Sequence, residues 1–349
     1  MENQPDTVVV FCPNWVGDVV MATPVYSCLR SSFPEAKIVC VIRRYALGVI
    51  SDSPWFDEII ACDDRGSAGF FELLMKLRSV KPDITVLLRN SFGSALLARL
   101  GGSGKVYGYK RDSRSLLLTD GPLPEKNDSG FVPVAMADYY LGLCRFMNLP
   151  IPADTRPSLY ISPELQEAGK RLHLKYGIRP DELIVGFNPG AKFGTSKCWS
   201  PENFAKVAEL FQEKWGCRIM LFAGPGEDEI AETITRTSKA DIINTAPDRV
   251  DLRLLKYLVQ RCGLLVTNDT GTRHYAVAFD IPVVVIMGPT DAAYTAASLQ
   301  KTSVIQKKLA CVPCHKKQCP EGHHDCMEMI TPEEVFEESC LLMEKLKTV

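Results

Sequence analysis

A carboxylate and a lysine, each placed after an apolar run, are the residues of this chain best suited to catalyse a transfer reaction. Asp18 follows the apolar run 7–11 and Gly17 at the start of an expected helix, where a carboxylate can accept the proton of an attacking hydroxyl group. Lys197 lies in the loop 188–199, where a lysine can neutralise the charge that grows on a diphosphate leaving group. The alternatives are a first-turn acid that caps the helix and a lysine on a solvated loop.

The stretch 264–291 has the pattern of a phosphate-binding turn. An apolar run at 264–267 precedes Asn268-Asp269-Thr270-Gly271, and a helix over 274–279 and a strand over 282–287 are expected next. Such a turn presents free backbone N–H groups and the positive end of a helix dipole at the edge of a sheet. Gly271 lets a ligand approach the backbone closely. An ordinary capped helix is the alternative.

An acidic residue after the expected strand 218–223 is a candidate ligand for ribose hydroxyl groups. Glu227 follows Gly224-Pro225-Gly226, and acids hold ribose at such positions in many nucleotide-binding folds. Glu229 competes for this role, and helix capping by either residue is the alternative. Two common phosphate motifs, the Walker A loop and GxGxxG after a strand, are excluded.

A cluster of cysteines near the C-terminus is a candidate metal site. Its members lie within 16 residues, with three histidines among them: Cys311, Cys314, Cys319 and Cys326, with His315, His323 and His324. The first two cysteines have a chelating spacing, but the later spacings match no standard zinc or iron–sulfur pattern. A structural metal, free thiols and disulfides therefore all stay open, and no catalytic metal site is expected.

Alternating strands and helices must position these residues. Strands are predicted at 7–11, 37–42, 58–61, 83–88 and 105–107, and helices at 19–31, 45–51, 70–79, 92–100 and 135–147. A loop is expected at 116–133. A second series follows the Pro-rich stretch 149–157, with a helix at 163–176, strands at 183–188, 218–223, 241–243, 264–267 and 282–287, and helices at 201–215, 227–238 and 252–261.

This alternation predicts an α/β protein with two doubly wound parallel sheets that bind their ligands in the cleft between them. The predicted domains are 1–155 and 156–331, and the final helix, within 332–349, is expected to pack back on the first domain. Composition is that of a soluble globular protein, with 46% hydrophobic residues, 23% charged residues and a formal net charge of −2. That balance gives no reason to expect nucleic-acid binding, no secretory signal or membrane span is expected, and thirteen cysteines fit a reducing cytoplasm.

Several motifs in one order resemble the ADP-heptose:lipopolysaccharide heptosyltransferases of glycosyltransferase family 9. They are Pro13-Asn14-Trp15-Val16-Gly17-Asp18, Arg89-Asn90-Ser91-Phe92, Asn188-Pro189-Gly190-Ala191 with Phe193-Gly194 and Lys197-x-Trp199, Asn268-Asp269-Thr270-Gly271-x-x-His274, Gly288-Pro289-Thr290 and the Cys-rich tail. The Asn-Trp-Val-Gly-Asp and Asn-Ser-Phe matches favour the heptosyltransferase II group over group I.

The resemblance implies a GT-B architecture with the acceptor on the first domain and the nucleotide sugar on the second. It implies inverting transfer of heptose from ADP-heptose to the first heptose of heptosyl-Kdo2-lipid A, without a cofactor or divalent metal. The enzyme would act at the cytoplasmic face of the inner membrane, which it would contact peripherally. A GT-B epimerase or hydrolase, and a metal- or redox-responsive binding protein, are the alternative functions.

The same resemblance implies a role for individual residues. Asp18 would be the general base, and Lys197 would hold the ADP phosphates. Asp269 would bind heptose hydroxyls, and Glu227 would bind ribose. The remaining donor-binding residues would be Thr270, Gly271 and Thr272, through their backbone N–H groups, and His274.

The turn after Gly271 departs from the family's usual sequence, and the acceptor-binding residues are not identified by the motifs. The usual turn reads Asp-Ser-Gly-Leu-Met-His, whereas Thr272 and Arg273 stand in the middle here, and Arg273 either adds charge near the phosphates or points to solvent. On the acceptor side, basic residues of the first domain are candidates for contact with phosphorylated Kdo or lipid head groups, with ordinary surface charge as the alternative: Arg43, Arg44, Arg89, Lys110, Arg111 and Arg114.

Overall fold

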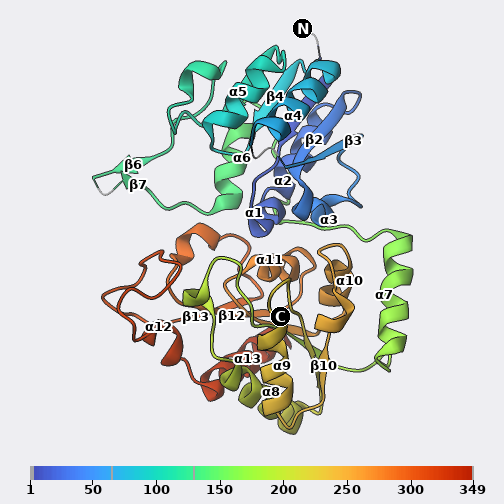
Figure 1. Ribbon diagram of the computed structural model, residues 1–349, viewed down its shortest axis with the longest axis vertical. Coiled ribbons are helices and arrows are strands. Elements are labelled where there is room, and N and C mark those ends of the chain that lie inside the picture. Colours follow the sequence, from blue (N-terminus) through green and yellow to red (C-terminus); the bar gives the residue numbers. More distant parts are fainter. Residues whose placement is uncertain (1–3, 64–65, 129, 348–349) are drawn as a thin grey trace. The chain divides into compact units, whose positions relative to one another are not determined.

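The computed structural model describes residues 4–63, 66–128 and 130–347. The chain divides into two compact units (Figure 1). Unit 1 runs to Ser158 and includes Ala293–Ala297, and unit 2 comprises Leu159–Ala292 and the chain from Ser298 onward. The predicted ranges 1–155 and 332–349 also contain residues 1–3, 64, 65, 129, 348 and 349, which lie outside the described residues.

Unit 1 is built on a five-stranded parallel sheet in the order β3-β2-β1-β4-β5. Its central strands are short apolar runs that are buried on both faces, as expected for a parallel sheet covered by helices. The strands are β1 (Thr7–Phe11), β2 (Lys37–Arg43), β3 (Glu58–Cys62), β4 (Ile84–Leu87) and β5 (Lys105–Gly108).

Helices cover this sheet, with α4 and α5 packed over the face that carries Val9 and Val39. The helices of unit 1 are α1 (Val16–Met21), α2 (Thr23–Ser32), α3 (Leu47–Ile50), α4 (Gly66–Val80), α5 (Phe92–Leu100) and α6 (Met136–Phe146). The predicted loop 116–133 contains a small antiparallel hairpin, β6 (Lys126–Asn127) with β7 (Gly130–Phe131). The short 3-10 turns of the whole described chain, in both units, are η1 (Arg44–Ala46), η2 (Ser115–Leu117), η3 (Thr195–Lys197), η4 (Ala246–Asp248) and η5 (Ala292–Thr295).

The predicted single helix 19–31 is wrong, because the chain forms two helices that meet at Ala22. Pro24 has no backbone N–H and cannot donate to a carbonyl one turn earlier. The hydroxyl of Thr23 donates to the Val20 carbonyl at 2.8 Å instead. The first of the two helices begins at Val16, so Asp18 lies in its first turn.

Unit 2 repeats this arrangement with one more strand, in the order β10-β9-β8-β11-β12-β13. This is the strand order of a Rossmann fold. The strands are β8 (Ile184–Asn188), β9 (Arg218–Leu221), β10 (Ile242–Asn244), β11 (Leu264–Asn268), β12 (Val283–Met287) and β13 (Thr302–Gln306). The last strand was not predicted, because its sequence Thr-Ser-Val-Ile-Gln has little apolar character and it lies at the sheet edge. The prediction of two doubly wound parallel sheets is confirmed.

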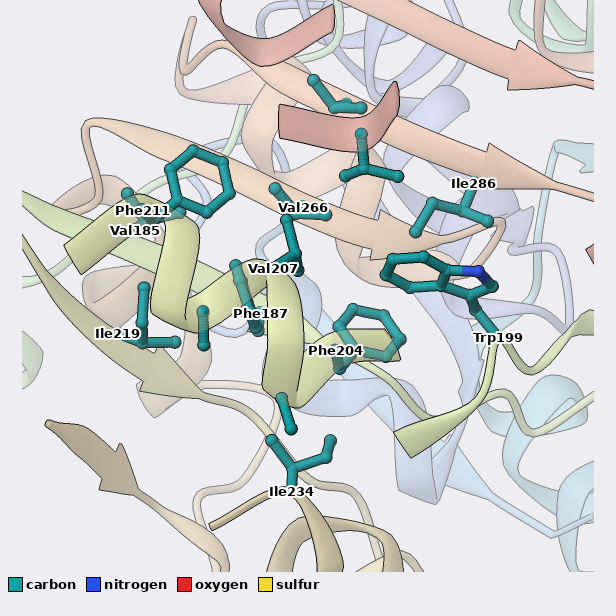
Figure 2. Packing of buried hydrophobic residues seen from close by; sticks show 14 of the residues in the cluster. Val185, Phe187, Trp199, Phe204, Val207, Phe211, Ile219, Ile234, Val266 and Ile286 are labelled. Carbon is teal, nitrogen blue, oxygen red and sulfur yellow. The ribbon is translucent and has the colours of Figure 1, made fainter. Parts of the chain in front are cut away.

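The core of unit 2 lies between its sheet and α8, where Phe187, Phe204 and Phe211 pack against Val266 and its neighbours (Figure 2). The helices of this unit are α7 (Pro163–Lys175), α8 (Pro201–Trp215), α9 (Asp228–Thr237), α10 (Leu254–Gln260), α11 (Gly271–Ala278), α12 (Asp325–Glu328) and α13 (Pro332–Lys347). Of the helices in the described ranges, none combines the length and the apolar character needed to cross a bilayer.

The final helix α13 packs within unit 2. The buried side of α13 presents Val335 and Leu342 to the core of unit 2, next to α8. Its apolar residues recur at helical spacing, so the sequence shows that one face is buried but not which domain covers it.

Candidate functional site

Asp18, Lys197 and Asp269 follow the strands at which the direction of winding changes in each sheet, whereas Glu227 follows β9. In unit 1 these strands are β1 and β4, and in unit 2 they are β8 and β11, which are neighbours in their sheets. Helices from such a neighbouring pair leave toward opposite faces, so their carboxyl ends frame the place where doubly wound folds bind ligands. The turn before α1 and the turn before α11 therefore lie at the expected ligand edge of their own units.

Lys197 and Asp269 form a closely packed ion pair in unit 2. Lys197 Nζ donates to Asp269 Oδ2 at 2.5 Å and to the Asp269 carbonyl at 3.1 Å. The side chains are only 12% and 10% exposed, so solvent screens the pair little. The ammonium also lies 5.0 Å from the centre of the Phe193 ring. Two loops that are 72 residues apart in the sequence thus meet at one charged contact.

Trp199 and Asn268 hold these two loops in place. The Trp199 indole is 1% exposed, packs edge-on against Phe204 at 5.0 Å and donates to the Ile330 carbonyl at 2.9 Å (Figure 2). The Asn268 amide accepts from the Trp199 backbone N–H at 3.2 Å and donates to the Pro189 carbonyl. Lys197 is therefore positioned two residues before a fixed anchor.

Three side chains donate hydrogen bonds to the Asp269 carboxylate. Thr290 donates to Oδ2 at 2.7 Å, beside Lys197, and Arg273 donates to Oδ1 at 3.1 Å. Burial alone raises the pKa of this carboxyl, but the charges of Lys197 and Arg273 outweigh burial and hold the pKa well below its usual range. A carboxylate offers about four lone-pair positions, so about one is left for a sugar hydroxyl.

The first turn of α11 forms the candidate phosphate cradle. This helix begins at Gly271, three residues before the predicted start, and Thr270 is its N-cap. The Thr270 hydroxyl donates to Asn188 Oδ1 at 3.0 Å, and in the described part of the chain it caps no backbone N–H of the helix. The first N–H groups of an α-helix have no acceptor within the helix, so those of Gly271 and Thr272 can bind an anion.

His274 lies on the same helix, and its side chain is buried. Burial, with the positive charge of Arg273, lowers the pKa of His274 to about 3. The imidazole is therefore neutral at physiological pH. A neutral imidazole adds no positive charge to the first turn of α11.

Glu227 is directed into the turn between β8 and η3. Its Oε2 accepts from the Gly224 N–H at 2.7 Å, and a β-carbon at Gly190 would lie 1.9–2.1 Å from its carboxyl atoms. Burial raises the pKa of Glu227, although the hydrogen bond from the Gly224 N–H lowers it in part. Glu229 is exposed on α9. Of the two candidate ribose ligands, only Glu227 therefore lies against the loop that also carries Lys197.

In unit 1, Asp18 receives a hydrogen bond from a residue that the sequence did not single out. Tyr140 of α6 donates to Asp18 Oδ1 at 2.8 Å. Burial, followed by the Asp18 charge, raises the pKa of Tyr140 well above its usual value. The phenol therefore stays protonated and keeps donating, which fixes the orientation of a half-buried carboxylate.

Arg89 and Arg114 are corrected from possible surface charges to interior residues. Arg89 is 3% exposed and donates to the Cys12 carbonyl at 2.7 Å, just before the loop that carries Asp18. Arg114 is fully buried and donates to Asn90 Oδ1 at 2.8 Å and to the Tyr109 carbonyl at 3.1 Å. The Arg89 guanidinium thus contacts the turn after β1, and the Arg114 guanidinium contacts the turn after β4.

The other basic candidates of unit 1 have local partners. Arg43 donates to Asn14 Oδ1 at 3.3 Å, Arg44 pairs with Asp63 at 3.6 Å, and Lys110 pairs with Asp120 at 2.7 Å. Arg111 lies 4.1 Å over the Phe131 ring. All four lie at or near the surface.

The cysteine-containing segment supports the Lys197 loop. The Ser196 hydroxyl donates to the Lys316 carbonyl at 2.6 Å, and His324 Nε2 lies 2.9 Å from the Ser196 carbonyl oxygen. Within the described residues, none of the four cysteines forms a disulfide bond. Among the described residues, no three His, Cys, Asp or Glu side chains are grouped so as to hold a metal ion.

The sequence did not indicate how Tyr140, Asn268, Thr290 and Arg273 would act. Thr290 follows β12, the neighbour of β11, and parallel strands end at the same sheet edge, so this placement was a usable signal. Tyr140 lies mid-helix, 122 residues after its partner, and carries no local signal.

The chain is similar to known sugar transferases over most of its length. Residues 70–324 match the model of glycosyltransferase family 9 (heptosyltransferase). The chain is 29% identical to lipooligosaccharide heptosyltransferase 2 of Haemophilus ducreyi over 95% of this chain and 97% of that protein. It is 27% identical to lipopolysaccharide heptosyltransferase 2 of Escherichia coli over 97% and 99%. The structure of E. coli ADP-heptose lps heptosyltransferase II matches with a TM-score of 0.80, at 25% identity over 98% and 99%.

Proposed function

The chain belongs to glycosyltransferase family 9, the heptosyltransferase family, and we propose that it transfers heptose from ADP-heptose to the first heptose of the lipopolysaccharide inner core. Its relatives of nearly equal length are named heptosyltransferase 2 or II. The observation that carries the proposal is the Lys197–Asp269 pair beside the start of α11, at the ligand edge of unit 2.

Unit 2 would bind the donor. The N–H groups of Thr270, Gly271 and Thr272 would receive the diphosphate, and Lys197 would neutralise the charge that develops on it as the bond to the sugar breaks. Glu227 would hold the ribose hydroxyls, and the lone pair left on Asp269 would accept a heptose hydroxyl. These protein donors supply what a divalent cation supplies in other transferases, so we propose that transfer proceeds in EDTA.

Unit 1 would bind the acceptor and supply the base. The acceptor hydroxyl oxygen bonds to the anomeric carbon, its proton passes to Asp18, and ADP leaves with the electron pair of the broken carbon–oxygen bond. A single displacement of this kind inverts the anomeric centre. Tyr140 would hold the Asp18 carboxylate toward the acceptor without competing for the proton, because the phenol is itself protonated.

We propose that unit 1 also contacts the cytoplasmic face of the inner membrane, where a lipid A-linked acceptor resides. Leu116 is 97% exposed and Leu123 is 76% exposed, both in the excursion that follows β5. In the same excursion, the cationic groups of Arg111 and Lys126 lie 4.1 Å and 4.9 Å from the centre of the Phe131 ring. Exposed apolar side chains beside basic groups suit the interface of an anionic bilayer.

The test is release of ADP from ADP-heptose by the purified protein in EDTA. It is run without acceptor, with Kdo2-lipid A and with heptosyl-Kdo2-lipid A. We expect release that depends on the heptosylated acceptor. Release with Kdo2-lipid A alone would indicate a heptosyltransferase I, and release without acceptor would indicate a hydrolase.

Two pairs of variants assign the roles. Asp18→Asn is expected to lower turnover by about 10²- to 10⁴-fold with unchanged ADP affinity, because only proton acceptance is lost. Asp138→Asn, an exposed acid on the helix that carries Tyr140, is the matched control. Lys197→Ala is expected to weaken ADP binding and to lower turnover, whereas the exposed Lys206→Ala should change neither. Normal turnover by Asp18→Asn would contradict the assignment of the base.

A further inference from the structure

Arg273 is a charged side chain in the interior of unit 2. Its side chain is 1% exposed, and Nη1 lies 3.1 Å from Asp269 Oδ1. Burial disfavours a guanidinium, and so does the positive end of a helix dipole, in whose first turn Arg273 lies. The neighbouring carboxylate offsets part of this cost, and Asp269 and Arg273 therefore form a buried ion pair within one helix turn.

Asp269 thus has two cationic partners, one on each oxygen. Lys197 and Thr290 donate to Oδ2, and Arg273 donates to Oδ1. One carboxylate cannot neutralise two cations, so the three charged groups carry a net charge of +1. Lys197 is the partner that can move, since its ammonium is a point charge on a flexible stem and is less deeply buried than Arg273.

We propose that Arg273 is a positioning residue that stays on Asp269 as a permanent counter-ion, so that Lys197 can move from the carboxylate to the diphosphate of the donor. The inference rests on the proposed function, because it assumes that unit 2 binds an ADP-sugar. If Arg273 were absent and Lys197 moved away, the buried Asp269 carboxylate would keep only the Thr290 hydroxyl of its three side-chain donors. Such an uncompensated buried charge is costly, so Lys197 would remain bound to Asp269.

The experiment is calorimetric titration with ADP of the wild type and three variants, Arg273→Met, Asp269→Asn and the double variant. Methionine keeps an unbranched apolar stem and removes the charge. We expect Arg273→Met to bind ADP at least tenfold more weakly than the wild type. The double variant should regain most of this loss, because the carboxylate that retains Lys197 is then gone. Thermal unfolding of each variant establishes that it is folded.

The double variant separates this role from two others. If Arg273 contacted the diphosphate directly, or only filled the interior, Arg273→Met would weaken ADP binding equally in the Asp269→Asn background. We expect the ADP affinities of Asp269→Asn and the double variant to differ by less than threefold. This comparison tests the positioning role even if Arg273→Met alone does not fold. Tight binding of ADP by Arg273→Met would overturn the inference and leave the proposed function intact. A wild type that binds no ADP would overturn both.

Discussion

Replacing Gly190 by alanine is expected to impair donor binding without unfolding the protein. The new β-carbon would lie 1.9 Å from the carboxyl carbon of Glu227 and 2.1 Å from both of its oxygens. Those atoms are the far end of a flexible side chain, so the carboxylate moves and the backbone does not. It must retreat by about 1 Å to reach a tolerable contact, which breaks its 2.7 Å bond from the Gly224 N–H.

The size of the effect follows from the bonds that are lost. A hydrogen bond to a charged group contributes about 1.5–3 kcal/mol, and 1.4 kcal/mol corresponds to a tenfold change in affinity. Displacement of a carboxylate that binds ribose should therefore weaken ADP binding by about tenfold to a hundredfold. Stability loses only the bond to Gly224, so the free energy of unfolding should fall by less than about 3 kcal/mol. Calorimetric titration and urea unfolding measure the two quantities.

A second substitution, at Glu227, tests whether the contact between residue 190 and the Glu227 carboxylate causes the loss of ADP affinity. Glu227→Asp withdraws the carboxylate by one methylene, so the double variant Gly190→Ala/Glu227→Asp should bind ADP better than Gly190→Ala alone. Gly93→Ala, where nothing lies within 4 Å of the new β-carbon, is the matched control and should leave ADP affinity unchanged. Wild-type affinity for ADP in Gly190→Ala would refute the placement of Glu227 against the ribose.

Two further predictions concern stability. Trp199→Phe removes the indole donor to the buried Ile330 carbonyl and leaves a void, so it should cost about 2–4 kcal/mol in urea unfolding, whereas the exposed Trp15→Phe should cost less than about 0.5 kcal/mol. Burial, with the nearby Arg261, lowers the pKa of His173 to about 4, so the unfolded chain binds a proton there that the folded chain does not, and stability falls as pH drops from about 6.5 toward 4. Between pH 7 and pH 5 the wild type should therefore lose about 2 kcal/mol that His173→Gln retains, and equal losses in urea unfolding would contradict this assignment.

Local pattern was sufficient for the elements and for the chemical character of the site. The apolar runs before Asp18 and Asn268 predicted buried parallel strands, and the polar turn at Asp269-Thr270-Gly271 predicted a helix start. These signals are local because alternation, capping and breaking residues act over a few positions. The same locality explains the errors: a helical pattern runs through the proline that divides α1 from α2, and the edge strand β13 has no apolar run.

Partners distant in sequence could be assigned only from the folded chain. The pattern identified Asp18, Lys197, Asp269 and Glu227 as polar residues after strands, but not that Tyr140 donates to the first or that Glu227 lies against Gly190. The sequence left Arg273 either near the phosphates or in solvent, whereas the fold buries it on Asp269. Composition and motif order therefore established which chemistry this chain carries. The packing of neighbouring strands brings together side chains 72 or 122 residues apart, and so it determines which charges meet and how each one is oriented.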